Sequence, residues 1–104
     1  IELKPQLSSD CFKFAKAILI VNYFGFPQNL ELINEYIKKN KCILIEDNAH
    51  GFLSCDSQGK YLGTRGDLGI FSIRKTIPLF HGAALYMKYK SKIVTIPKQL
   101  EFLD

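Results

Sequence analysis

Two short apolar runs in the first half of the chain predict buried strands. AILIVNY at residues 17–23 is compact and lacks strict alternation, and CILIED at residues 42–47 has the same character. Runs of this kind are typical of strands that are buried on both faces of a parallel sheet. The sequence therefore predicts two neighbouring parallel strands.

The segment between these runs, PQNLELINEYIKKN, has the spacing of an amphipathic helix. Leu30, Ile33 and Ile37 fall on one helical face, with an acidic residue in the first turn and two lysines in the last. Asn29 is suited to the N-cap and Asn40 to the C-terminal stop. Strand, helix and strand then form a βαβ unit, whose crossover is almost always right-handed. The predicted fold class is α/β.

The second half of the chain is rich in glycine before apolar residues return. Residues 51–69 are predicted to be loop and short strand, with DSQGK forming a hairpin-like turn. LGIFSI at residues 68–73 and AALYM at residues 83–87 are two further candidate strands, on either side of Lys75. Residues 88–104 are predicted to be a strand end followed by a helix.

Four polar side chains follow the predicted strands and suggest a chemistry. Asp47 and His50 come after the second strand, Ser72 ends the third, and Lys75 follows among apolar residues that reduce its hydration. A lysine amine that condenses with an aldehyde, a carboxylate that keeps a pyridine nitrogen protonated and a phosphate-binding hydroxyl suit pyridoxal phosphate. Each residue also has a purely structural interpretation. Asp47 can cap a turn and His50 can be a polar loop residue, while Ser72 can end a strand and Lys75 can point to solvent.

Composition narrows the class of protein. The 104 residues are 47% hydrophobic and 23% charged, as in one globular domain. The apolar runs are far shorter than the roughly 20 residues of a membrane-spanning helix.

The cysteines indicate the redox compartment. Cys11, Cys42 and Cys55 are odd in number and form neither a CxxC pair nor a zinc pattern, which favours a reducing cytoplasm. The chain has no signal-peptide pattern and does not begin with methionine, so we expect a fragment of a protein that is not exported.

The net charge of +4 raises the question of nucleic-acid binding. No recognised RNA- or DNA-binding motif accompanies the basic residues, so a solvated face is favoured. The basic and aromatic residues concerned are Lys88, Lys90, Lys92, Lys98, Tyr86 and Tyr89.

Three motifs, in order along the chain, carry a family resemblance. They are VNYFGFP at 21–27, ILIEDNAHG at 43–51 and GTRGDLGIFSIRKTIPLFHGAAL at 63–85. Together they resemble the DegT/DnrJ/StrS-type sugar aminotransferases, over about residues 15–88. The resemblance implies a three-layer α/β sandwich with a mostly parallel sheet, the large domain of fold-type-I pyridoxal-phosphate enzymes. Residues 1–104 are then part of that domain, without its N-terminal part and without the C-terminal small domain.

The resemblance also implies roles for individual residues. Asp47 matches the aspartate that pairs with the pyridine nitrogen, Ser72 the serine that contacts the phosphate, and Lys75 the Schiff-base lysine, which is also the catalytic residue. His50 stands where the family usually has a glutamine near the ring hydroxyl of the cofactor. A histidine can still donate a hydrogen bond there.

The sequence departs from the usual family pattern near the lysine. Ser72 and Lys75 are three residues apart, where five is common, although a subgroup with Ser-x-Arg-Lys-x-x-Pro shows the shorter spacing. His81 and Ala83 replace an acidic residue and a second glycine. These departures affect the expected substrate and catalytic competence more than the fold.

By resemblance, the expected reaction moves an amino group from an amino acid such as glutamate to a keto-sugar nucleotide, in nucleotide-sugar or surface-polysaccharide biosynthesis. The expected assembly is a homodimer, with no nucleic-acid or membrane partner and no metal. Lys75 favours transamination, because the dehydrating members of the family have histidine there. The alternatives are a non-catalytic remnant or regulatory module of the same fold, and an unrelated α/β binding or nucleic-acid domain.

Overall fold

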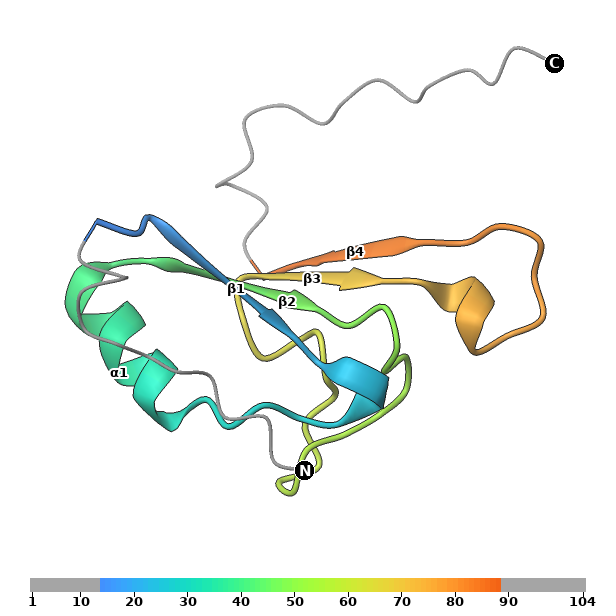
Figure 1. Cartoon of the computed structure of the whole chain (residues 1–104), viewed down its shortest axis with the longest axis horizontal. Helices are drawn as coiled ribbons and strands as arrows, with labels where there is room; N and C mark the ends of the chain where they lie inside the picture. The colour runs from blue at the N-terminus through green and yellow to red at the C-terminus, as the bar shows by residue number, and fades with distance from the viewer. Residues whose placement is uncertain (1–13, 89–104) are drawn as a thin grey trace, which may run out of the picture.

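The computed structural model of the chain describes residues 14–88, which form one mixed sheet, one α-helix and two short 3₁₀ helices (Figure 1). No helix in this range is long and apolar enough to cross a lipid bilayer. In chain order the elements are β1 (Ala17–Val21), η1 (Tyr23–Gly25), α1 (Glu31–Asn40), β2 (Ile43–Asp47), β3 (Leu68–Phe71), η2 (Ile73–Lys75) and β4 (Ala84–Met87).

The sheet has the strand order β1-β2-β3-β4, which is also the order along the chain. β1, β2 and β3 are parallel, and β4 pairs antiparallel with β3. The predicted α/β class and the mostly parallel sheet are therefore confirmed. The third strand is shorter than predicted, because Ser72 and Ile73 leave the ladder to enter η2.

Helix α1 covers one face of the sheet, below it in Figure 1. Ile33 is 1% exposed and packs against Ile18, Ile20 and Leu44 from β1 and β2. Leu30 and Ile37 lie partly buried beside this cluster, as the helical spacing predicted. The burial of this apolar stripe, rather than intrinsic propensity, fixes the helix on the sheet.

The ends of α1 differ from the prediction by one residue. The N-cap is Leu30 rather than the predicted Asn29, and Leu30 makes no side-chain capping hydrogen bond. The side-chain oxygen of Asn29 still accepts a hydrogen bond from the Glu31 N–H (2.9 Å), so it satisfies one of the free N–H groups of the first turn. The helix ends at Asn40, but the left-handed residue that stops it is Lys41, with φ of 53°. The Lys41 N–H closes the last turn on the carbonyl of Ile37.

The prediction that the strands are buried on both faces is wrong for residues 14–88. Burial alternates along β1 and β2, and the face opposite α1 shows exposed apolar side chains, including Leu19 (58%), Ile70 (42%) and Leu85 (57%). No helix among the described residues lies over that face, so this part of the chain has two layers rather than the predicted three.

The loop between β2 and β3 is ordered by turns and by a close backbone contact. Cys55 and Tyr61 form an antiparallel bridge, and the Asp56 carboxylate accepts hydrogen bonds from the N–H groups of Gln58 and Lys60, which confirms the predicted turn. Further on, a Cβ atom at Gly69 would overlap the main-chain oxygen of Gly63, so only glycine fits β3 at that point.

Two sequence predictions concern residues that lie partly or wholly outside residues 14–88. The predicted C-terminal strand end and helix lie outside this range, as do Lys90, Lys92 and Lys98 of the basic cluster. Among the cysteines inside it, Cys42 is buried and Cys55 is exposed, and both are free thiols.

Candidate functional site

The carboxyl ends of the three parallel strands lie at one edge of the sheet, on the right in Figure 1. Three segments leave the sheet here: η1 after β1, the loop after β2, and η2 after β3. Of the four predicted site residues, Asp47 ends β2 and His50 follows it in the loop. Ser72 and Lys75 belong to the turn after β3. The topology therefore brings them to one edge, as the sequence predicted, since ligand sites in such sheets collect beyond the strand ends.

Asp47 is the last residue of β2 and pairs in register with Val21 and Ile70. Its neighbours Leu44 and Glu46 are buried on the α1 side, so strand alternation puts Asp47 on the opposite face. Its Oδ1 accepts a hydrogen bond from the Ala49 N–H (3.0 Å). The aspartate thus caps the following turn, and within residues 14–88 its second carboxylate oxygen has no hydrogen-bond partner.

Ser72 and Lys75 begin and end the turn that follows β3. Ser72 comes two residues after Ile70, the partner of Asp47 in the ladder, and its carbonyl accepts a hydrogen bond from the Lys75 N–H (3.3 Å). Neither the Ser72 hydroxyl nor the Lys75 amine bonds to another group within the described residues. Lys75 is exposed, so the predicted loss of hydration is wrong for this part of the chain.

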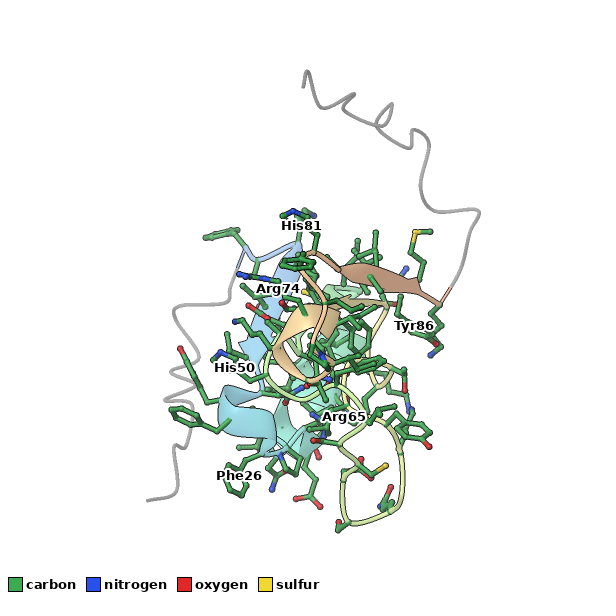
Figure 2. The ribbon with its side chains drawn as sticks, turned by 90° about the vertical axis from the view of Figure 1, so that its right-hand side faces the viewer. Phe26, His50, Arg65, Arg74, His81 and Tyr86 are labelled. Atoms are coloured by element: carbon green, nitrogen blue, oxygen red, sulfur yellow. The ribbon has the colours of Figure 1, made fainter. Side chains whose placement is uncertain are left out.

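His50 is exposed and lies against an aromatic ring from η1. Its imidazole stacks on the ring of Phe24, with ring centroids 5.9 Å apart and planes 20° from parallel. Figure 2 looks onto this edge and shows His50 below Arg74 and His81, which belong to the segment after β3. The described structure leaves the imidazole accessible from the edge of the sheet.

A buried polar cluster beneath this edge was not predicted from the sequence. It consists of Glu46, Arg65, Asn22 and Asn48. Glu46 is 0% exposed and forms an ion pair with Arg65, whose side chain is 6% exposed, at 2.7 Å between Oε1 and Nη2. The Arg65 Nε also donates to Oε1 (2.8 Å), and the Arg65 main-chain N–H donates to Oε2 (2.9 Å).

The two asparagines extend this cluster into the neighbouring loops. Arg65 donates to the side-chain oxygen of Asn22 (3.1 Å) and to the main-chain oxygen of Gln28 (3.2 Å). Asn48 donates to the main-chain oxygens of Gly51 (2.8 Å) and Leu62 (3.0 Å). Through these hydrogen bonds the cluster connects the loop after β2 to the ends of β1 and β2, directly beside Asp47.

One signal in the sequence indicates this cluster. Glu46 stands two residues after Leu44, and in a strand these two residues share a face. A carboxylate on a buried face needs a cation, and a nearby arginine is a suitable partner. Interpreting CILIED as a uniformly buried run hid that alternation.

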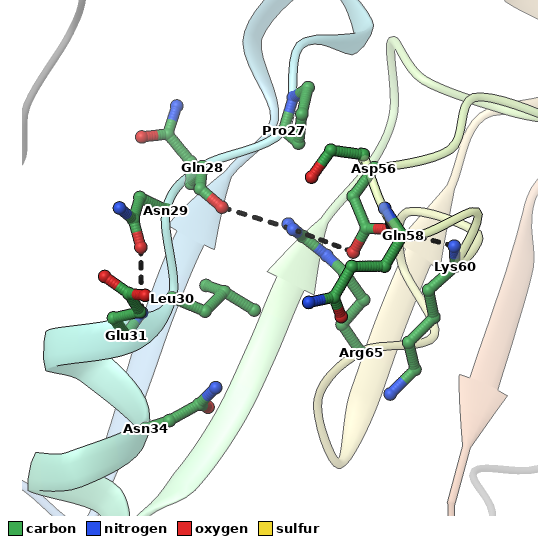
Figure 3. A pocket seen from close by; sticks show the side chains of 11 residues that line it. Pro27, Gln28, Asn29, Leu30, Glu31, Asn34, Asp56, Gln58, Lys60 and Arg65 are labelled. Atoms are coloured by element: carbon green, nitrogen blue, oxygen red, sulfur yellow. Dashed lines mark hydrogen bonds and ion pairs between the residues drawn. The ribbon is translucent and has the colours of Figure 1, made fainter.

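One cavity formed by the described residues lies away from the four predicted site residues. It has a volume of about 470 Å³ and lies between the start of α1 and the hairpin turn, with Arg65 in its wall (Figure 3). Its lining includes the amides of Gln28 and Asn34 and the charged groups of Asp56 and Lys60. In this wall the Arg65 guanidinium donates to the Gln28 carbonyl (3.2 Å) and lies 3.8 Å from an Asp56 oxygen. None of Asp47, His50, Ser72 and Lys75 lines it.

Comparison with protein families gives a match over most of the chain. The sequence profile of the DegT/DnrJ/EryC1/StrS aminotransferase family matches residues 7–89. GDP-perosamine synthase from Escherichia coli O157:H7 is 38% identical over 78 residues, which cover 73% of this chain and 21% of that protein. UDP-4-amino-4,6-dideoxy-N-acetyl-beta-L-altrosamine transaminase from Campylobacter jejuni is 34% identical over 82 residues, covering 77% of this chain and 22% of that protein.

Two further matches carry the name of a dehydratase, one from sequence comparison and one from structure comparison. GDP-4-keto-6-deoxy-D-mannose 3-dehydratase from Escherichia coli O55:H7 is 44% identical over 62 residues, covering 55% of this chain and 14% of that protein. A crystal structure of GDP-4-keto-6-deoxymannose-3-dehydratase, a histidine-to-asparagine mutant with bound GDP-perosamine, superposes with a TM-score of 0.50 at 41% identity. That superposition covers 56% of this chain and 15% of the other. The chain spans about a fifth or less of the length of these relatives.

Proposed function

We propose, because the chain belongs to the DegT/DnrJ/EryC1/StrS aminotransferase family, that it is the cofactor-binding part of a pyridoxal-phosphate-dependent sugar aminotransferase. The observation that carries the proposal is the meeting of the ends of β2 and β3, which bring Asp47, Ser72 and Lys75 to one edge of the sheet. Residues 1–104 are then part of a large domain, and the bare sheet face is where a third layer packs.

The groups at this edge fit pyridoxal phosphate chemically. Asp47 has a free carboxylate oxygen, and the Ser72 hydroxyl and the Lys75 amine have no competing partners in the described residues. When bound, the cofactor supplies an aldehyde that attaches to an amine and a ring that withdraws electrons from the substrate carbon. The three side chains provide an anion for the ring nitrogen, a hydroxyl for the phosphate and an amine for the aldehyde.

Each residue has a distinct task in this proposal. Asp47 holds the proton on the ring nitrogen, and its turn-capping hydrogen bond to Ala49 fixes the carboxylate at the strand end. Ser72 orients the phosphate, and His50 donates a hydrogen bond near the ring hydroxyl. Lys75 would be the catalytic residue: its amine would hold the cofactor through the aldehyde carbon and would take and return the proton at the substrate carbon.

The proposed substrates follow from the relatives, whose names include two enzymes of GDP-linked sugars. We propose a keto-sugar nucleotide as acceptor, an amino acid such as glutamate as donor, a homodimer as the assembly and the cytoplasm as the location. Dehydration is the competing reaction, because a dehydratase is among the relatives. The lysine at position 75 favours amino transfer over dehydration.

Reductive trapping tests the cofactor site directly. The chain is mixed with pyridoxal phosphate, reduced with borohydride and mapped by peptide mass spectrometry, alongside Lys75→Ala and, as a matched exposed lysine, Lys60→Ala. We expect an adduct on Lys75 that is lost in Lys75→Ala and kept in Lys60→Ala. An adduct spread over several lysines in wild type, or unchanged by Lys75→Ala, would overturn the assignment.

Product analysis then separates the reactions. The complete polypeptide carrying residues 1–104 is incubated with a keto-sugar nucleotide and glutamate, and the sugar product is identified by mass. A gain of an amino group supports the proposal, while loss of a hydroxyl indicates the dehydratase. A specific Lys75 adduct without turnover indicates the non-catalytic module.

A further inference from the structure

The second residue of η1, Phe24, has a backbone conformation that its side chain does not explain by burial. It lies in the left-handed region with φ of 54° and ψ of 21°, which residues other than glycine, asparagine and aspartate rarely adopt. Its side chain is 79% exposed, so core packing does not compensate for the unfavourable backbone. Backbone outliers persist where the surrounding structure holds them in place, and they cluster at functional sites.

Contacts on both sides of Phe24 define its place. The Gly25 N–H donates to the Asn22 carbonyl (3.2 Å) and the Phe26 N–H to the Tyr23 carbonyl (3.0 Å), which close the η1 turn. A Cβ at Gly25 would stand 3.3 Å from the main-chain oxygen of His50. The turn therefore packs directly against the loop after β2.

The one ring contact that Phe24 makes among the described aromatic residues is with His50. The two rings are nearly parallel, at 20°, with centroids 5.9 Å apart, an offset stacked arrangement. Such a contact restricts rotation of the imidazole and leaves the ring nitrogens at its rim available. His50 is three residues after Asp47, and it is the residue proposed to donate a hydrogen bond to the cofactor. The stacking on Phe24 therefore restricts a proposed cofactor-binding side chain.

We infer that Phe24 is a positioning residue for the cofactor site, holding the His50 imidazole at the angle from which it donates to the cofactor. This inference rests on the proposed function, in which His50 donates a hydrogen bond to the cofactor. It assigns no contact between Phe24 and the cofactor itself. It explains why an exposed phenylalanine occupies a conformation that glycine adopts more easily.

Replacement by glycine separates this role from a structural one. Phe24→Gly removes the ring and also relieves the left-handed backbone, so the fold is not expected to weaken. Leu53→Gly is the matched control, since Leu53 also has positive φ (70°) and an exposed side chain (64%) in the facing loop. Phe24→Tyr keeps a ring of the same size and is the conservative rescue.

The measurement is the dissociation constant for pyridoxal phosphate, from the visible absorbance of the bound cofactor in the complete polypeptide. Loss of a well-oriented hydrogen bond predicts weakening of about three- to tenfold for Phe24→Gly. Phe24→Tyr and Leu53→Gly are expected to bind like wild type, and the thermal midpoint of Phe24→Gly to stay unchanged. Equal affinity of Phe24→Gly and wild type, or a lowered midpoint with equal loss in Phe24→Tyr, would overturn the inference.

A double variant tests whether Phe24 acts through His50. In a His50→Ala background, Phe24→Gly is expected to cause no further loss of affinity, because the ring has nothing left to orient. Independent, additive losses would contradict a positioning role. Absence of any Lys75 adduct in wild type would instead refute the proposed function, so the two failures are distinguishable.

Discussion

The buried ion pair between Glu46 and Arg65 gives the sharpest stability prediction. Arg65→Met removes both guanidinium contacts to Oε1, at 2.7 and 2.8 Å, and leaves a carboxylate that is 0% exposed without a cation. The main-chain N–H of residue 65 and the amide of Asn22 remain as its donors. Removing one partner of a buried pair costs about 3–5 kcal/mol, and Glu46→Leu is expected to cost a similar amount.

The double variant Glu46→Leu/Arg65→Met distinguishes the contribution of the ion pair from the separate contributions of the two side chains. Independent sites would lose about 6–10 kcal/mol together, but a double replacement leaves no unpaired buried charge. We expect a loss of about 2–5 kcal/mol, because the Asn22 and Gln28 oxygens lose a donor. An exposed arginine provides the control, and Arg74→Met is expected to change stability by less than about 0.5 kcal/mol.

The assay is urea denaturation of the complete polypeptide carrying residues 1–104, with equal m-values required across the four proteins of the cycle. Strict additivity of the two single losses would refute the argument that Glu46 and Arg65 stabilise the fold as a pair. So would a single variant as stable as wild type, since it would mean that water or another group solvates the remaining charge.

Three further perturbations test the fold. Ile33→Ala empties a site that is 1% exposed and is expected to lower the free energy of unfolding by about 2–5 kcal/mol in denaturant titration. Gly69→Ala forces a Cβ onto the Gly63 carbonyl oxygen, so we expect little folded protein in the soluble fraction. The Lys60 N–H that donates to Asp56 lowers the pKa of that carboxyl below its ordinary value of 3.8. Asp56 therefore stabilises the fold above pH 3.8 and less as pH falls through its folded value, a dependence that Asp56→Asn is expected to lose.

Matched controls keep these tests specific. Leu32→Ala removes a side chain of equal size from α1 that is 67% exposed, and is expected to be nearly neutral. Gly59→Ala meets no atom within 4 Å, although its φ of +76° disfavours alanine, so it is expected to cost far less than Gly69→Ala. Equal losses within either pair would contradict the packing described above.

The fold was predictable where one local rule dominated. The spacing of Leu30, Ile33 and Ile37 identified the buried face of α1, and the compact apolar runs identified β1 and β2. Burial on the second sheet face was not predictable from those runs. An apolar strand residue carries no information about whether the chain that covers it lies within the same 104 residues.

The positions of the predicted site residues in the fold were predictable, and their surroundings were less so. Asp47, Ser72 and Lys75 lie at one edge of the sheet because parallel topology fixes where neighbouring strands finish. The Glu46–Arg65 pair was missed, since it joins residues 19 apart in the chain whose contact depends on the path of the loop. The stacking of Phe24 on His50 depends on a backbone conformation that sequence patterns do not encode.

The strand order has a consequence for how the chain assembles. Within residues 14–88, β2, β3 and β4 each pair with the strand that precedes them along the chain, and none of these strands is inserted between two earlier ones. During synthesis, β1 and β2 can pair as soon as β2 has emerged after α1, and β3 and β4 can then add in turn at the growing edge. Nucleation of this sheet therefore requires closing only loops of moderate length, which favours rapid formation of the β1-α1-β2 unit before the rest.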